Sequence, residues 1–457
     1  MKRGICAGLV AFLLLAIPTS AKAEAYWPEG PAVKAPSAIV MEVNSGAILY
    51  EKNSDAVNYP ASITKVLTTL LALEHSDLDE VVTFSDDAIR YNQGDTSHIA
   101  RDYGEKMTMK ECLYAVMLES ANECAYAVAE HVGKKLGGNY QTFIDMMNER
   151  AKELGCTNTH FTNANGLPDE NHWTSAHDMA LISAEAYKNE DFRIIVGTRS
   201  YRIPPTNKHK DITPLNNHHA MISNYKTNAH LYAYSTGGKT GYTRAAGATL
   251  VSYAEKDGLT LVCVVMKTTT SAYYVDTRSL FDHCFQNFQK VAIGSTGDIE
   301  PGKDEGLGSM NNYEPYVKLD ENAQIVLPIT ADVSDVEMTL VDKDLPAGAI
   351  AQLNYTYGGR VVGCVDVVFS DAKVDGNYFD GQAEEDDTKV IVIKPSYIAI
   401  GLGILLAVVV LIVVGKRLYD NYYVIKHDME VRKQRRERFR PASGRKKKWR
   451  KRDRMFK

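Results

Sequence analysis

A serine and a lysine stand three residues apart in Ser62-Ile63-Thr64-Lys65, at the start of a segment with helical composition. On a helix, this spacing places the hydroxyl and the amine on one face, within mutual reach. The positive end of the helix dipole favours an alkoxide and lowers the pKa of a neighbouring lysine. A lysine that has lost its proton can serve as the base that activates a serine. The predicted chemistry is nucleophilic attack by Ser62.

The spacing alone is weak evidence, because Ser223/Lys226, Ser370/Lys373 and Ser443/Lys446 share it. Only Ser62 is followed by both Ser120-Ala121-Asn122, a Ser-x-Asn motif, and Lys239-Thr240-Gly241, the single Lys-Thr-Gly motif, with room between them for a layer of helices. The order of the three motifs therefore selects Ser62 over the other pairs.

The segments that would hold these motifs change in type along the chain. Strand-like runs at 38–43 and 47–50 flank an Asn-Ser-Gly turn, which predicts a hairpin. Helical patterns follow at 62–74, 109–132, 140–154 and 175–188, strand patterns at 247–254 and 259–266, and a last helix at 275–288. This order predicts one antiparallel sheet made from both ends of the region, with helices packed on it.

Over residues 35–288 the chain resembles the low-molecular-mass penicillin-binding proteins, specifically the type-5 D-alanyl-D-alanine carboxypeptidases of the bacterial cell wall. The resemblance rests on Pro60-Ala61-Ser62-Ile63-Thr64-Lys65, Ser120-Ala121-Asn122-Glu123, Asn165-Gly166-Leu167-Pro168-Asp169 with Asn171-His172, and Gly238-Lys239-Thr240-Gly241-Tyr242-Thr243. It implies an α/β fold of the serine β-lactamase/DD-peptidase type, in which helices sandwich an antiparallel sheet.

The resemblance also implies a role for each motif residue. Ser62 would attack the carbonyl between two D-alanines, Lys65 would be the general base, and Ser120 would relay the proton to the leaving amine. The implied substrate-binding residues are Asn122, Lys239, Thr240, Gly241 and Tyr242, with the backbone N–H groups of Ser62 and Tyr242 forming the oxyanion hole. The implied partners are peptidoglycan stem peptides ending in D-Ala-D-Ala and β-lactam antibiotics; no cofactor is implied.

Two other functions stay open at this point. A β-lactamase on the same fold would need a deacylating base, for which Glu170 is the one candidate in a suitable stretch. A non-hydrolytic penicillin-binding sensor or scaffold is the other alternative. A metal site built from His209, His218, His219 and His230 fits no familiar spacing, so no metal is expected. Arg244 and Arg278 could assist a substrate carboxylate but carry no assignment.

The charge of the chain is unevenly distributed. The 457 residues carry a net charge of −5, but residues 416–457 hold 18 basic and five acidic residues. Residues 1–23 have a basic start, an apolar run and an Ala-x-Ala site, typical of a cleaved signal peptide, with an uncleaved anchor as the alternative. Residues 397–415 are uncharged and long enough to span a bilayer. Because positively charged segments next to a membrane span stay on the cytoplasmic side, the basic tail is expected in the cytoplasm and the preceding chain outside. Nucleic acid is not an expected partner.

These features predict six parts, which are a signal peptide (1–23), a catalytic domain (24–293), a small all-β domain (309–370), an acidic spacer (371–395), a single transmembrane helix (396–415) and a basic cytoplasmic tail (416–457). The six cysteines after the signal segment form no Cys-x-x-Cys motif and lie mostly in apolar runs. They are therefore interpreted mainly as buried thiols.

Overall fold

The computed structural model describes residues 26–90, 96–293, 317–319, 324–341 and 351–369, with short helical pieces between 426 and 435. The chain divides into two compact units, Met1–Ala372 and Lys373–Lys457. Within the described residues, no helix is long and apolar enough to cross a membrane. The predicted signal peptide and the predicted transmembrane segment both lie outside the described residues, as does the acidic spacer.

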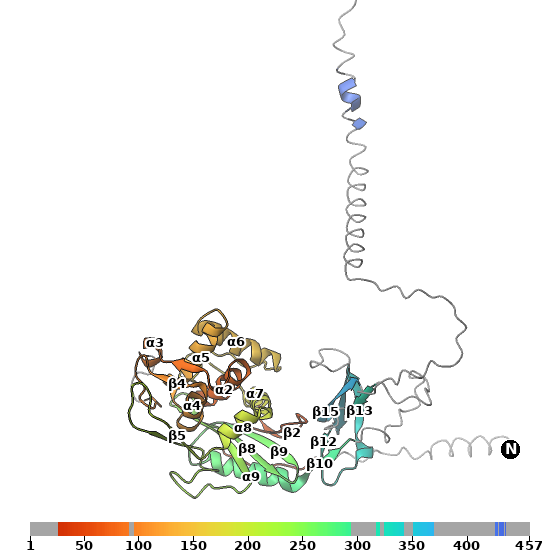
Figure 1. The fold of residues 1–457 in the computed structure, drawn as a ribbon. Helices are drawn as coiled ribbons and strands as arrows, with labels where there is room; N and C mark the ends of the chain where they lie inside the picture. The colour runs from red at the N-terminus through yellow and green to blue at the C-terminus, as the bar shows by residue number, and fades with distance from the viewer. Residues whose placement is uncertain are drawn as a thin grey trace, which may run out of the picture. The chain divides into compact units, whose positions relative to one another are not determined.

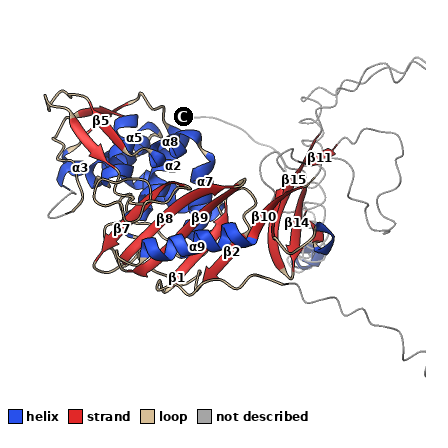
Figure 2. Ribbon diagram, turned by 90° about the horizontal axis from the view of Figure 1, so that it is seen from below, coloured by secondary structure: helices blue, strands red, loops and turns tan. Residues whose placement is uncertain are grey.

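A five-stranded antiparallel sheet forms the centre of the catalytic region, in the order β2-β1-β9-β8-β7 (Figures 1 and 2). The strands are β1 (Ser37–Glu42), β2 (Ile48–Lys52), β7 (Ser235–Thr243), β8 (Gly247–Lys256) and β9 (Leu259–Thr268). The N-terminal hairpin joins the later strands because β1 pairs with β9. The predicted sheet built from both ends of the region is confirmed. β7, which carries the Lys-Thr-Gly motif, lies at an edge of the sheet.

Helices cover both faces of this sheet (Figure 2). On one face, α7 (Ala176–Lys188) and α8 (Glu190–Gly197) contact the sheet, and the other face packs on α9 (Tyr273–Asn287). The remaining helices of the first layer pack behind α7 and α8 in the same hydrophobic core: α2 (Lys65–His75), α4 (Met109–Tyr114), α5 (Asn122–Lys135) and α6 (Tyr140–Glu153). Shorter elements connect them: η1 (Ala61–Thr64), β3 (Val81–Thr83), α3 (Asp86–Arg90), β4 (Lys106–Thr108), η2 (Ala115–Glu119), β5 (Ser200–Ile203) and β6 (Thr213–Asn216).

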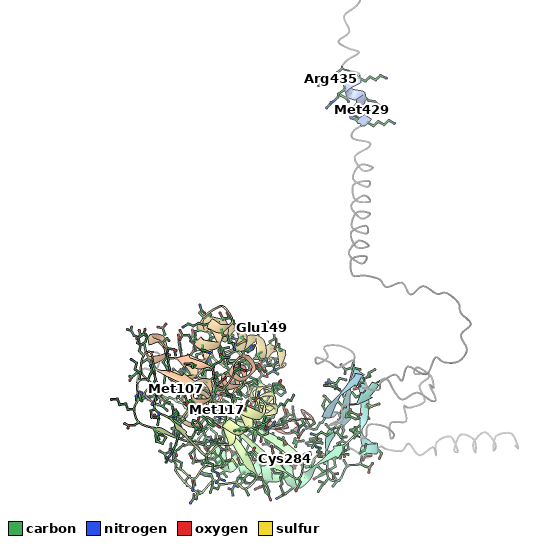
Figure 3. All side chains as sticks on the ribbon, viewed as in Figure 1. Met107, Met117, Glu149, Cys284, Met429 and Arg435 are labelled. Atoms are coloured by element: carbon green, nitrogen blue, oxygen red, sulfur yellow. The ribbon has the colours of Figure 1, made fainter. Side chains whose placement is uncertain are left out.

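The side chains of β9 show why two layers form. Val262, Val264 and Met266 belong to the core on the side of the helical layer, whereas the alternate residues Leu261, Cys263 and Val265 belong to the core beneath α9. Successive strand residues point to opposite faces, so a strand that is apolar at every position requires cover on both. In Figure 3, Met107 and Met117 lie within the helical layer and Cys284 lies on the α9 side.

The segment predicted as one helix over 109–132 is divided in the structure. After α4, the chain makes a π-helical turn, η2, and Ser120 then adopts a left-handed conformation with φ +60° before α5 begins at Asn122. The apolar pattern of the sequence runs on across the break because the residues before and after it, in α4 and α5, are buried in the same way. The break turns the Ser-x-Asn motif toward the cavity that Ser62 also lines.

Small β-sheets follow the last helix. β10 (Phe288–Ala292) pairs with β12 (Gln324–Pro328), and β11 (Val317–Leu319), β15 (Arg360–Phe369), β14 (Ala351–Tyr357) and β13 (Glu337–Val341) form a four-stranded sheet; η3 (Val333–Asp335) is a short turn among them. Their core includes Ile325, Leu327 and Val362. All six cysteines of the described residues are free, and Cys112, Cys124, Cys263 and Cys284 are buried.

Candidate active site

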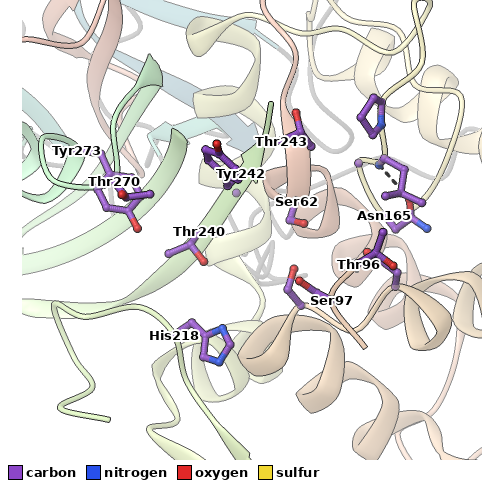
Figure 4. A pocket seen from close by; sticks show the side chains of 16 residues that line it. Ser62, Thr96, Ser97, Asn165, His218, Thr240, Tyr242, Thr243, Thr270 and Tyr273 are labelled. Carbon is purple, nitrogen blue, oxygen red and sulfur yellow. Dashed lines mark hydrogen bonds between the residues drawn. The ribbon is translucent and has the colours of Figure 1, made fainter. Parts of the chain in front are cut away.

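Ser62 lies in a tight turn that opens the first long helix. The turn is the 3-10 segment Ala61–Thr64, and α2 continues it from Lys65. Ala61 has a left-handed backbone with φ +53°, an unfavourable conformation for a residue with a side chain. Two hydrogen bonds hold the turn, from Thr249 Oγ1 to the Pro60 carbonyl at 2.8 Å and from Thr64 Oγ1 to the Ala61 carbonyl at 2.9 Å. Ser62 is thereby presented to a cavity of about 480 Å³ (Figure 4).

Lys65 lies directly beneath Ser62. Its Nζ is 3.1 Å from Ser62 Oγ, 2.7 Å from Asn122 Oδ1 and 2.6 Å from the carbonyl oxygen of Asn165. The last two atoms can only accept hydrogen bonds. A neutral amine has two N–H groups and one lone pair, so donating to both acceptors leaves the lone pair toward the Ser62 hydroxyl. This arrangement suits a base that removes the proton from Ser62 Oγ.

The surroundings of Lys65 favour its neutral form. The side chain is fully buried, and burial lowers the pKa of its ammonium well below the ordinary value, with a further lowering from the positive charge of Lys239. Glu123, at the start of α5, opposes this shift, because its negative charge raises the pKa of Lys65. The cost of removing the ammonium of Lys65 from water is larger than the stabilisation that the charge of Glu123 gives it, so the net shift of the pKa is downward.

The Ser-x-Asn motif meets the same cavity from the helical layer. The backbone N–H of Asn122 donates to the carbonyl of Ser97 at 2.9 Å, which holds the residue in place. The side-chain oxygen of Asn122 accepts from Lys65. Ser120 also lines the cavity, and its buried Oγ has no hydrogen-bond partner among the described residues. An unpaired buried hydroxyl costs free energy unless a ligand satisfies it. Ser120 Oγ is thus available to a bound molecule.

The Lys-Thr-Gly motif forms the opposite wall of the cavity. Thr240, Gly241 and Tyr242 line it from the edge strand β7, and the Tyr242 side chain is 66% exposed (Figure 4). A Cβ atom at Gly241 would lie 2.3 Å from Thr249 Oγ1 and 2.9 Å from the backbone nitrogen of Ser62. The absence of a side chain therefore lets β7 lie against the turn that carries Ser62.

Lys239 lies behind this wall, fully buried, and its Nζ donates to the Thr240 carbonyl at 2.9 Å. Burial lowers the pKa of Lys239 to about 7, and the carboxylate of Glu119 opposes that shift. Glu119 and Glu123 flank the Ser-x-Asn motif on its two sides. The charge of Glu119 raises the pKa of Lys239, and that of Glu123 raises the pKa of Lys65. Neither glutamate was predicted to have a role; their positions beside Ser120 and Asn122 were the signal that could have identified them.

Several other cavity residues were also missed. Thr96, Ser97, Thr270 and Tyr273 come from loops or helix ends with no motif. His218 was considered only as a metal ligand; in the structure it lines the cavity, and its Nε2 lies 2.9 Å from Glu119 Oε2.

The other three histidines of that stretch have separate partners, and His230 packs against the ring of Tyr274. His219 is fully buried, with its Nε2 2.8 Å from Ser252 Oγ. His209 lies near Asp102 and Glu105, a grouping that could hold a cation by distance. However, Glu105 already accepts from Arg101, Thr206 and His209, and the Arg101 guanidinium at 2.9 Å supplies the positive charge. This cluster is therefore an ion-pair network around a buried carboxylate.

The remaining candidates do not line the Ser62 cavity. Glu170 lines a neighbouring cavity instead, and no carboxylate is among the described residues that line the Ser62 cavity. Arg244 is exposed in the turn after β7. Arg278 donates to the Leu231 carbonyl and lies over the Tyr232 ring. The geometry thus brings together Ser62, Lys65, Ser120, Asn122, Lys239, Thr240, Gly241 and Tyr242, and leaves out the two arginines and Glu170.

Known proteins are similar to this chain in sequence and in fold. Residues 23–270 match the Peptidase_S11 family, described as D-alanyl-D-alanine carboxypeptidase. The chain is 33% identical over 358 residues to D-alanyl-D-alanine carboxypeptidase DacF of Bacillus subtilis, covering 75% of this chain and 86% of that protein. It is 31% identical to D-alanyl-D-alanine carboxypeptidase DacA of Haemophilus influenzae, covering 78% of this chain and 88% of the relative.

Among solved structures, the DD-transpeptidase of Streptomyces K15 matches with a TM-score of 0.52 and 28% identity, over 57% of this chain and all of that chain. Ser62 beside the buried Lys65, a Ser-x-Asn loop and a Lys-Thr-Gly edge strand thus coincide with a match in both sequence and fold. The chain belongs to the Peptidase_S11 family of serine D-alanyl-D-alanine carboxypeptidases.

Proposed function

We propose that this protein removes the terminal D-alanine from peptidoglycan stem peptides through an acyl-enzyme on Ser62, and that penicillin inhibits it by acylating the same residue. The observation that carries the proposal is the arrangement around Lys65, whose Nζ lies within hydrogen-bond distance of two acceptors, Asn122 Oδ1 and the Asn165 carbonyl, and of Ser62 Oγ. When Lys65 is neutral, this arrangement is suited to making an alkoxide of Ser62.

Acylation proceeds in two stages of proton transfer. Lys65 takes the proton of Ser62 Oγ, which bonds to the carbonyl carbon of the penultimate D-alanine. The backbone N–H groups of Ser62 and Tyr242 bind the resulting oxyanion; one such donor is commonly worth about 10²–10³ in rate. The Ser120 hydroxyl passes its proton to the leaving nitrogen and takes one from the Lys65 ammonium, so that Lys65 is neutral again; the C–N bond breaks, and D-alanine departs. Water then hydrolyses the Ser62 ester.

The edge strand β7 binds the peptide. An extended substrate can add to an exposed sheet edge through main-chain hydrogen bonds. Lys239 and Thr240 bind the terminal carboxylate, and the Asn122 side chain binds an amide of the substrate as well as Lys65. The absence of a side chain at Gly241 keeps the strand against the Ser62 turn.

An assay of the full chain in detergent tests this function. We expect free D-alanine from a peptide ending in D-Ala-D-Ala, and a fluorescent penicillin label that clears slowly. Both should be lost in Ser62→Ala and kept in Ser223→Ala, which alters the serine of a Ser-x-x-Lys pair outside the cavity. Rapid penicillin turnover without D-alanine release would instead indicate a β-lactamase. A stable penicillin label, with neither D-alanine release nor penicillin hydrolysis, would indicate a sensor.

The pH dependence follows from the two buried lysines. Lys65 acts as a base only when neutral, so kcat/KM should fall on the acid side as it gains a proton. Lys239 attracts a carboxylate only as an ammonium, and its pKa is lowered to about 7 by burial. We therefore expect kcat/KM of the free enzyme to fall as pH rises above about 7, by up to tenfold per pH unit.

Two comparisons test that assignment. Glu119→Gln removes a charge that raises the pKa of Lys239, so the alkaline fall should move to lower pH. A substrate with a C-terminal carboxamide carries no charge for Lys239 to attract, so it should lack the fall. An alkaline fall of the same size and position with the carboxamide peptide would refute the role of Lys239.

We also propose that the catalytic region lies outside the cell, tethered by residues 396–415. This part of the proposal is supported by the sequence alone, through the signal-like start, the uncharged segment and the basic tail. The full chain should stay in the membrane fraction during alkaline extraction, and a chain without residues 396–457 should be released from it. Extraction of the full chain by alkali would refute the tether.

A further inference from the structure

A second cavity adjoins the Ser62 cavity. It has a volume of about 270 Å³, and its lining includes Tyr59, Trp173, Glu170 and Lys267. Two segments of chain line both cavities. Gly166–Pro168 line the first and Glu170 and Trp173 the second, while Thr243 lines the first and the following turn, at Ala245 and Ala246, lines the second. A molecule bound along β7 can therefore extend from one cavity to the other.

The second cavity offers a free carboxylate and a free ammonium. Glu170 and Lys267 are both exposed, and neither makes a hydrogen bond or an ion pair with any residue in the described part of the chain. A surface charge usually either pairs with an opposite charge or extends into solvent from a convex surface. Here two opposite charges remain unpaired in one hollow, beside the rings of Tyr59 and Trp173.

The backbone at Lys267 has an unusual conformation. Lys267 is left-handed, with φ +57°. It lies at a β-bulge, because Ala248 pairs with Thr268 and Leu250 with Val265, which leaves Met266 and Lys267 opposite a single residue of β8. A bulge redirects a side chain, and bulges are over-represented beside active sites. A left-handed non-glycine residue is strained, and such strain concentrates at functional positions.

The opposite wall is held in a fixed position. His172, between Glu170 and Trp173, is buried; its Nε2 lies 2.9 Å from Thr64 Oγ1, and its Nδ1 accepts from the backbone N–H of Thr162 at 3.1 Å. Trp173 forms a β-bridge with His160 and packs edge-on against its ring. The segment that carries Glu170 is thus anchored to the turn of Ser62.

The proposed function sets the direction in which a peptide would run. With its carboxylate at Lys239 and Thr240 and its scissile carbonyl near Tyr242, the peptide runs antiparallel to β7. The preceding residue then lies about 3.3 Å further along the strand, toward Thr243 and the turn. The second cavity opens at that point.

We propose that this cavity is the subsite for the side chain of the residue that precedes D-Ala-D-Ala, and that it selects a side chain ending in both an ammonium and a carboxylate. Glu170 binds the ammonium and Lys267 the carboxylate, while Tyr59 and Trp173 cover the aliphatic part. A side chain ending in an ammonium alone uses half of the site. This inference rests on the proposed function, because that function places the peptide along β7.

Four synthetic peptides test the inference with the full chain. Each ends in D-Ala-D-Ala, and the preceding residue is a diamino dicarboxylic acid, lysine, α-aminoadipate or norleucine. We expect kcat/KM for D-alanine release to be highest for the first, about fivefold lower when one charge is missing, and lowest for norleucine. Equal values for all four peptides would overturn the subsite, whereas no release from any of them would overturn the proposed function instead.

Two variants assign the charges. Glu170→Gln should lower kcat/KM about fivefold for the two peptides with an ammonium, and Lys267→Gln should do so for the two with a carboxylate, with norleucine unchanged in both. Lys267→Arg should keep the preference. Glu149→Gln and Lys152→Gln, exposed charges on α6, are the matched controls and should change nothing. Equal losses on all four peptides, norleucine included, would refute the assignment; an unchanged rate of penicillin labelling shows that each variant is folded.

Discussion

Replacing Lys65 with methionine should slow acylation of Ser62 by a fluorescent penicillin by about 10⁴-fold, the range seen when a general base is removed. Methionine has a similar length but no lone pair that could take the proton of Ser62 Oγ. The loss should appear in the acylation rate for penicillin and for peptide alike, because both reactions need the same alkoxide. Stopped-flow or gel-based labelling measures it directly.

The chain provides a matched control for this variant. Lys226 stands three residues after Ser223, as Lys65 does after Ser62, but it is exposed and does not line the Ser62 cavity. Lys226→Met should therefore label at the normal rate. Thermal unfolding separates loss of the base from loss of the fold, since burying methionine removes the cost of a buried amine while leaving Asn122 Oδ1 and the Asn165 carbonyl without a donor. Labelling of a folded Lys65→Met within tenfold of normal would show that Lys65 is not the base.

Replacing Gly166 with alanine should lower the acylation rate at least 100-fold and also lower the stability. A Cβ atom there would lie 1.9 Å from the carbonyl oxygen of Ala61 and 3.0 Å from the backbone nitrogen of Ser62. Because these are backbone atoms, the turn that carries the nucleophile has to move. Displacements of about 1 Å at a catalytic group can cost about 10² in rate.

Gly155 separates this steric effect from the effect of backbone conformation. Gly155 has φ +84° and Gly166 has φ +83°, but a Cβ atom at Gly155 meets nothing within 4 Å. Alanine at either position costs about 1–2 kcal/mol for a left-handed backbone. Only Gly166→Ala should also slow penicillin labelling. If both variants label at the same rate, the close approach to the Ser62 turn has no part in catalysis.

The proximity of the candidate site residues was predictable from the sequence because it depends largely on local order. The i, i+3 spacing of Ser62 and Lys65 fixes their proximity on one helical turn, and the later motifs could be assigned by their order alone. The sheet was predictable for a related reason, since strands such as β9 alternate between two cores and require cover on both faces. The segment 109–132 shows the limit of this approach. Its apolar periodicity continues through a π-helical turn and a left-handed Ser120, so periodicity predicted one helix.

What the sequence determined by itself was the set of candidate site residues, the order of the elements and the partition of charge along the chain. The tertiary structure alone decided how those groups are tuned. The pKa of Lys65 falls because folding buries it beside Lys239, a residue far away in the sequence. The second cavity likewise forms where Lys267, at a bulge of β9, meets a loop that lies about a hundred residues earlier in the chain. Desolvation and close approach between distant segments depend on packing, which local sequence patterns do not encode.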